Sequence, residues 1–186
     1  MIKGVRCLLS LCAGALLLTV GCAGGEKREK AEDTVELKLG ESYAIEGTEM
    51  TLQIEEAYET EELSPADPSG YFYYYEDKEG YHYYVVSAKL INPARIAVKP
   101  ADFEAVASKG RKKYETKVVL EASSGAMFLR EDEETVGEEP TLHLLVLVED
   151  GKDAPDTVEL YYNNGLAEKK EDELWDRGVR IDLSYF

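Results

Sequence analysis

The stretch Thr141-Leu-His-Leu-Leu-Val-Leu-Val-Glu149 decides the fold class, because apolar residues alternate along both of its faces. In an extended chain, successive side chains point to opposite sides. One side of this stretch carries only leucine and valine: Leu142, Leu144, Val146 and Val148. The other side carries His143, Leu145 and Leu147. A strand that is apolar on both faces is typical of the centre of a sheet, so we expect a central strand here.

A second strand is predicted from Tyr81 to Ile91, where every second residue is again apolar. One face of it carries Tyr84, Val86, Ala88 and Leu90. It must end at Asn92-Pro93, because proline has no amide hydrogen to donate to a neighbouring strand. A loop is therefore expected after Ile91.

Shorter runs of the same period are separated by Gly, Pro, Asn and Asp. They predict strands at Val35–Leu39, Tyr43–Glu46, Met50–Tyr58, Tyr71–Glu76, Phe103–Ala107, Lys113–Leu120, Thr157–Tyr162 and Val179–Tyr185. About ten short strands with so little helix between them favour an all-β, antiparallel two-layer sandwich over a parallel sheet. One short helical segment is expected near the C-terminus, from Leu166 to Trp175, with Gly178 after its end.

The first residues have the composition of a secretory leader. Met1 to Arg6 is basic, and Cys7 to Leu18 is apolar over a length typical of a signal-peptide core and short for a membrane span. The following Leu18-Thr19-Val20-Gly21-Cys22 resembles the bacterial lipobox, although Thr19 stands where that pattern prefers leucine. The resemblance implies cleavage before Cys22 and a lipid on its thiol. The alternative is an uncleaved anchor from Cys7 to Gly25.

This division predicts three parts: a signal peptide over residues 1–21, a lipidated, flexible and charged tether over residues 22–33, and one β-sandwich domain over residues 34–186. The leader contains two of the three cysteines, so no disulfide is expected in the mature chain. The protein is therefore expected at the cell membrane, held by its lipid on the extracytoplasmic face.

The charge is strongly acidic. The chain has 21 Lys and Arg against 38 Asp and Glu, and loss of Lys3 and Arg6 with the leader leaves 19 against 38, a net charge of −19. Such a surface repels nucleic-acid phosphates and keeps a protein soluble, so we expect a monomer that binds no nucleic acid.

Three stretches together resemble a known family: Gly80 to Asn92, the aromatic Phe103, and Leu142 to Val148. They are similar to the immunoglobulin-like domain of unknown function common in Gram-positive surface lipoproteins. The likeness covers roughly residues 39–162. It implies an immunoglobulin-like β-sandwich behind a lipobox, and it implies no catalytic residues and no cofactor.

Seven of the 13 tyrosines lie close together, around Asp77-Lys-Glu-Gly80. A four-residue turn there would pair Tyr71–Glu76 with Tyr81–Ile91. On that register Tyr73 lies opposite Tyr84 and Tyr71 opposite Val86 on the core face. The outward residues would be Phe72, Tyr74, Tyr81 and Tyr83. Exposed aromatic rings suit sugar rings or a protein partner, whereas the alternative is cross-strand packing without a ligand.

Other polar clusters have a functional and a plain interpretation. The basic run Lys109–Lys113 could contact an anionic surface or be a solvated turn that discourages strand pairing. Acidic clusters such as Glu131–Glu134 invite a calcium site but lack the spacing of a calcium loop. His82 and His143 both fall within strands, so neither a zinc site nor a nucleophilic triad is indicated.

The sequence therefore favours a non-enzymatic binding or accessory module on the membrane, with a cell-wall polymer or an envelope protein as its partner and no metal or cofactor. Two alternatives remain open at this point. One is an extracellular hydrolase that uses carboxylates, which needs a deep cleft with a raised carboxyl pKa. The other is a purely structural spacer, which would lack an exposed aromatic patch.

Overall fold

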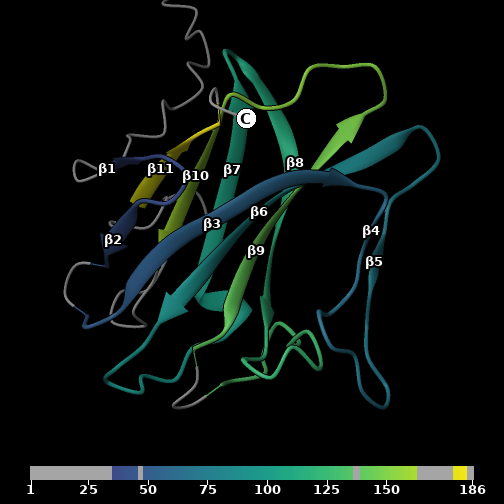
Figure 1. Cartoon of the computed structure of the whole chain (residues 1–186). Coiled ribbons are helices and arrows are strands. Elements are labelled where there is room, and N and C mark those ends of the chain that lie inside the picture. Colours follow the sequence, from purple (N-terminus) through teal and green to yellow (C-terminus); the bar gives the residue numbers. More distant parts are fainter. Residues whose placement is uncertain (1–34, 46–47, 136–138, 163–177, 184–186) are drawn as a thin grey trace, which may run out of the picture.

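A computed structural model of the chain describes residues 35–45, 48–135, 139–162 and 178–183. In this part of the chain nearly all regular structure is β-strand (Figure 1). The strands are β1 (Val35–Leu37), β2 (Ser42–Ala44), β3 (Thr51–Thr60), β4 (Glu62–Leu63), β5 (Tyr75–Glu76), β6 (Tyr81–Ile91), β7 (Phe103–Lys109), β8 (Lys112–Glu121), β9 (Thr141–Glu149), β10 (Thr157–Tyr162) and β11 (Gly178–Asp182). A single 3₁₀ turn, η1 (Pro100–Asp102), precedes β7.

Nine of these strands follow one hydrogen-bonded order, β1-β11-β10-β7-β8-β9-β6-β3-β2. This hydrogen-bonded order passes from one layer of the sandwich to the other at β8. Residues Lys112–Tyr114 of β8 pair with β7, and Glu115–Glu121 pair with β9. One layer therefore consists of β1, β11, β10, β7 and the start of β8, and the second layer consists of the rest of β8 with β9, β6, β3 and β2. Strands β4 and β5 form a separate pair beside the second layer (Figure 1).

The main core lies between the two layers, and it contains the apolar faces that the period of two predicts. Tyr84, Val86, Ala88 and Leu90 of β6 are all buried in it, as are Leu142, Leu144, Val146 and Val148 of β9. The facing layer contributes Phe103, Ala105 and Ala107 from β7 and Val158, Leu160 and Tyr162 from β10. The sequence prediction of an all-β, antiparallel sandwich is confirmed.

A second, smaller cluster covers the other face of β9. It consists of Leu63, Val85, Val119, Phe128 and Leu145. Leu63 comes from the β4–β5 pair and Phe128 from the loop after β8, so these two segments cover what would otherwise be an exposed apolar sheet face. The prediction that β9 is central is confirmed, since β9 lies between β6 and β8.

The predicted tyrosine hairpin is wrong. Strand β6 pairs with β3 on one edge and with β9 on the other, so neither edge is left for Tyr71–Glu76. Tyr84 lies opposite Glu59 and Val146, and Val86 lies opposite Ala57 and Leu144. The predicted strand shrinks to Tyr75–Glu76, which pairs with Glu62–Leu63.

The other predicted strands differ from the observed ones mostly at their ends. The bounds of β6, β9 and β10 are as predicted. The antiparallel pattern has one exception, because β1 pairs with β11 in parallel. The predicted helix at Leu166–Trp175, the leader, Cys22 and the tether lie outside the described residues.

The loop predicted after β6 is held by Asn92. This side chain is buried, and it donates from Nδ2 to the carbonyl of Ile96 at 2.7 Å while its Oδ1 accepts the Ile96 amide at 3.0 Å. Between them, Arg95 takes a φ of 54°, which a non-glycine residue rarely adopts. Asn92 therefore acts as a clamp that closes a tight loop.

Candidate binding site

The aromatic segment Tyr71–Tyr75 is positioned by the loop that precedes it. Three backbone amides tie this loop, Ser64–Gly70, to the last residue of β8 and to the turn that follows it. Ala66 N donates to Glu121 Oε1 at 2.6 Å, Asp67 N to the Gly125 carbonyl at 2.8 Å, and Ser69 N to the Ala126 carbonyl at 3.4 Å. The segment therefore starts from a fixed point on the sandwich.

Gly125 is required for this attachment. Its φ is +70°, in the left-handed region that favours glycine, and a Cβ at this position would lie 3.3 Å from Asp67 N. A side chain here would strain the turn and press on the loop that it holds.

The opposite wall of the site is the segment Met127–Arg130. It runs beside the end of β8, with Phe128 bridged to Glu121 and Leu129 N donating to the Leu120 carbonyl at 2.8 Å. Phe128 is buried, and its ring centroid lies 5.5 Å from that of Tyr75 and 5.9 Å from that of His143. The wall thus rests on the second core cluster.

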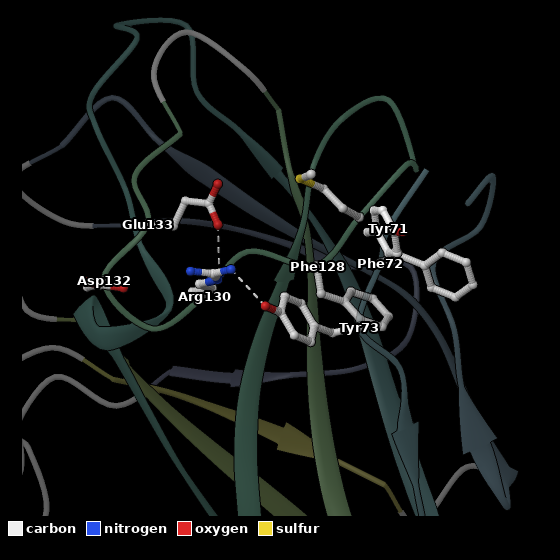
Figure 2. Close-up of a pocket in the computed structure, with 8 residues that line it drawn as sticks. Tyr71, Phe72, Tyr73, Phe128, Arg130, Asp132 and Glu133 are labelled. Atoms are coloured by element: carbon white, nitrogen blue, oxygen red, sulfur yellow. Dashed lines mark hydrogen bonds between the residues drawn. The ribbon is translucent and has the colours of Figure 1, made fainter. Parts of the chain in front are cut away.

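Between these walls lies a hollow of about 760 Å³, called the aromatic hollow (Figure 2). Its aromatic, methionine and arginine lining consists of Tyr71, Phe72, Tyr73, Met127, Phe128 and Arg130. Figure 2 shows Tyr71 and Phe72 on the side of the hollow away from Arg130. The hollow is large enough for a ligand of the size that typical pockets hold.

Arg130 connects the two walls. Its guanidinium lies 5.4 Å from the Tyr73 ring centroid and donates to the Tyr73 hydroxyl at 2.7 Å (Figure 2). Its backbone amide donates to Glu133 Oε2 at 3.2 Å. The bond between Arg130 and Tyr73 fixes the orientation of an exposed ring, so less side-chain entropy is left to lose on binding.

The four residues predicted to face outward have different surroundings. Phe72 and Tyr74 are 39% and 53% exposed. Phe72 lines the aromatic hollow, and Tyr74 lines an adjoining one of about 400 Å³, called the middle hollow. Tyr81 and Tyr83 are half-buried on β6 and line neither of these two hollows.

Tyr81 and Tyr83 have packing partners instead. The ammonium of Lys78 lies 4.2 Å from the Tyr81 ring centroid. Tyr83 packs against the second core cluster and donates its hydroxyl to the Glu76 carbonyl at 3.2 Å. Burial, with Asp77 and Glu115 nearby, raises the pKa of Tyr83.

Sequence reasoning missed five residues of the hollow. Tyr71 and Tyr73 were expected on the core face, but Tyr71 is fully exposed and Tyr73 is 55% exposed. Met127, Phe128 and Arg130 were not singled out at all, because they come from a loop more than fifty residues further along the chain. The available signal was an apolar run, Ala126-Met-Phe-Leu129, within a polar loop.

A buried polar network lies beneath this site. Ser87 Oγ lies 2.9 Å from His143 Nδ1, and His143 Nε2 lies 3.0 Å from Glu121 Oε2. Ser87, His143 and Glu121 are 2%, 6% and 5% exposed. Burial alone would raise the pKa of Glu121, but hydrogen bonds from His143 and the Ala66 amide, with the attraction of His143, hold that pKa below its usual value.

Serine, histidine and carboxylate are the residue types of a nucleophilic triad, but their surroundings here are those of core packing. Ser87 is also hydrogen-bonded to Tyr58, and burial raises the pKa of Tyr58 in spite of that bond. Neither the aromatic hollow nor the middle hollow includes Ser87 or His143 in its lining. The network connects β6, β8 and β9 and fixes the Ser64–Gly70 loop through Ala66.

The basic run Lys109–Lys113 lies at the turn between β7 and β8, as expected. Lys109 Nζ lies 3.5 Å from Asp153 and 3.6 Å from Asp156, and Lys112 lies over the Tyr114 ring at 4.3 Å. These contacts place part of the run against acids and an aromatic ring of the same domain.

Two further findings apply to the described residues alone. No three of their His, Cys, Asp and Glu side chains gather in a way that could hold a metal ion. No helix among them has both the length and the apolar character that a membrane crossing needs.

Among solved structures, the fold is similar to that of an uncharacterized β-sandwich protein from Clostridium difficile 630. The TM-score is 0.56 at 16% sequence identity, and the match covers 85% of this chain and 99% of that one. This chain has the same β-sandwich fold. At so low an identity the likeness shows the fold alone. No family model and no curated protein matches the chain.

Proposed function

We propose that this protein is an extracytoplasmic lipoprotein, anchored to the membrane through a lipid on Cys22, that acts as a non-enzymatic binding module. Its binding surface is the aromatic hollow with the adjoining side chain of Tyr74. The anchor rests on the resemblance of residues 18–22 to a lipobox. The non-enzymatic role rests on the resemblance of Gly80–Asn92, Phe103 and Leu142–Val148 to the immunoglobulin-like domain of surface lipoproteins.

One observation carries the binding part of the proposal. The large hydrophobic side chains that are exposed among the described residues are Leu39, Tyr71, Phe72, Tyr73, Tyr74 and Met127. All but Leu39 line the aromatic hollow or the middle hollow next to it. A soluble domain gains nothing from gathering apolar area in solvent, and such patches mark sites of interaction. A plain spacer domain has no physical reason to keep this patch.

The anchor is tested by metabolic labelling with radioactive palmitate. The wild-type chain should take up label and fractionate with membranes, and the Cys22→Ala variant should take up none. Label retained by Cys22→Ala, or an unlabelled wild-type chain found in the cytosol, would contradict the anchor.

Binding is tested by retention of the purified protein on isolated cell-envelope material. The Phe72→Ala/Tyr74→Ala double variant should lose at least tenfold in retention, because it removes two exposed rings from the site. Leu39→Ala is the matched control, since Leu39 is an exposed hydrophobic residue outside the hollows, and it should retain as the wild type does. Unchanged retention of the double variant would reject this surface.

A further inference from the structure

The aromatic hollow continues across the surface into two further hollows. It shares Tyr73, Phe128 and Arg130 with the middle hollow. The middle hollow shares Pro100, Lys117, Val118 and Glu131 with a third hollow of about 400 Å³ between β7 and β8, called the strand-gap hollow. The aromatic and strand-gap hollows share no lining residue, so the middle hollow joins them. These three adjoining hollows together are called the trough.

The shape of the trough favours an extended occupant. Each hollow alone has a volume in the range of a small-molecule pocket. A compact ligand would fill one of them and leave the other two empty. A chain of linked units would occupy all three.

At the strand-gap hollow β7 and β8 separate, and the half-buried Thr116 and Val118 of β8 line the hollow there. In β7, Phe103–Val106 pairs with β10, but pairing with β8 begins at Ala107. In β8, Glu115–Val119 pairs with β9 after β8 has left β7. Within the described residues a side chain spans this gap, with Thr116 Oγ donating to the Ala105 carbonyl at 2.6 Å. The β7 side of the gap is buried at Phe103 and Ala105, so the edge of β8 is the one that an extended peptide can pair with through main-chain hydrogen bonds.

The composition of the other end favours a polypeptide over a glycan. Tyrosine, phenylalanine, methionine and arginine are the residues enriched at the centres of protein interfaces, and they are the residues of the aromatic hollow. A glycan could also stack on these aromatic rings, but it has no peptide main chain with which to pair as a strand with the edge of β8.

Charge selects the kind of polypeptide. The chain has a net charge of −17, and the exposed acids Glu131, Asp132 and Glu133 line the trough. The two cations of the trough are already engaged, Arg130 with Tyr73 and Lys117 over the Tyr75 ring at 4.9 Å. A basic segment is therefore attracted over long range and meets acids at the rim.

We infer that the trough binds an extended polypeptide segment of a partner protein in which Lys or Arg alternates with aromatic or aliphatic residues. This inference rests on the proposed function and names the partner class for that same site. The aromatic hollow takes the apolar side chains, the rim acids contact the basic ones, and the edge of β8 pairs with the main chain.

The test uses the full-length lipoprotein in detergent and a phage library of random dodecapeptides. Selected peptides should alternate basic and apolar residues, and their binding, measured by fluorescence anisotropy, should weaken as salt rises. Tyr73→Ala should weaken binding of the best peptide at least tenfold, and Leu39→Ala should leave it unchanged. Methylation of alternate backbone amides of the peptide should weaken binding to a similar extent.

Lys117→Glu distinguishes the sign of the partner's charge. It adds negative charge in the middle of the trough, so a basic peptide should bind several-fold more tightly. Weaker binding of every selected peptide to Lys117→Glu would overturn the inference. Unfolding midpoints in urea should match the wild type for Tyr73→Ala and Leu39→Ala, whose side chains are exposed.

Two outcomes separate this inference from the proposed function. If no peptide is enriched, while purified linear cell-wall glycan strands bind and Tyr73→Ala abolishes that binding, the inference is wrong and the binding module stands. If neither probe binds and the Phe72→Ala/Tyr74→Ala variant keeps its retention on envelope material, both are wrong.

Discussion

Removing the Glu121 carboxylate is the most informative change to the interior. This buried group accepts hydrogen bonds from His143 Nε2 at 3.0 Å and from the Ala66 amide at 2.6 Å. Glu121→Ala leaves both donors without their acceptor. Breaking a buried pair by removing one partner costs about 3–5 kcal/mol. For a domain of this size each kcal/mol lowers the unfolding temperature by about 2–4 °C, so we expect a fall of roughly 10 °C.

Glu121→Gln is the matched control. The amide oxygen can accept from Ala66, and the amide nitrogen can donate to His143 once the imidazole takes the other tautomer. This variant keeps both hydrogen-bond partners but replaces bonds to a charged group by neutral ones, so we expect a loss of about 1 kcal/mol in unfolding free energy, the difference between the two kinds of bond. Unfolding in urea is monitored by circular dichroism. Equal losses of unfolding free energy in the two variants, or a loss below about 1 kcal/mol for Glu121→Ala, would refute the reasoning.

The lowered pKa of Glu121 also predicts how the free energy of unfolding changes at acidic pH. The pKa of Glu121 lies below its usual value of 4.5 in the folded chain, so the unfolded chain binds the proton more tightly. The stabilisation from this group is complete above pH 4.5 and is lost as the pH falls through the folded value. The free energy of unfolding of Glu121→Gln should lack this part of the pH dependence. If the wild type and Glu121→Gln lose stability equally as the pH falls, other groups cause the loss.

Three further predictions concern single buried side chains. Leu144→Ala, in the centre of the core, should lower the free energy of unfolding by about 2–5 kcal/mol in urea, and a smaller loss would mean that the core closes around the cavity. Asn92→Ala should cost about 2–3 kcal/mol, because both polar groups of Ile96 lose their partner, and faster hydrogen exchange of the Ile96 amide checks it. Burial, with Glu59 nearby, raises the pKa of Tyr84 to about 12. The free energy of unfolding should therefore fall as the pH rises from 10 towards 12. An equal fall in the Tyr84→Phe variant would contradict this prediction.

The sequence predicted the layers well because burial on both sides of a strand leaves a readable pattern. Strands β6 and β9 combine a period of two with length, and Asn92-Pro93 ends β6. Their observed bounds are the predicted ones. Both strands are central, so every residue is subject to the same rule of alternation.

The tyrosine segment was predicted wrongly because proximity in sequence was taken to mean pairing. A strand has two edges, and both edges of β6 are taken by β3 and β9. Tyr75 instead pairs with Leu63, across a loop whose anchor is a side chain of β8. Alternation gives the faces of a strand but carries no information about its neighbours.

The sequence predicted only one wall of the candidate site, because it carries no information about which distant segments meet. Phe72 and Tyr74 were correctly expected to be exposed, but the second wall, Met127–Arg130, meets them only through the fold. The network of Ser87, His143 and Glu121 was not foreseen either. It depends on the register that brings Ser87 opposite His143, which no local pattern contains.

Strand β8 is hydrogen-bonded to β7 at one end and to β9 at the other, so the two halves of the sandwich have a backbone connection as well as a shared core. Separating them requires a ladder of main-chain bonds to break in addition to the side-chain contacts. The halves therefore cannot act as independent opening units, and amide protons on both sides of the fold should become exposed to solvent in a single cooperative event.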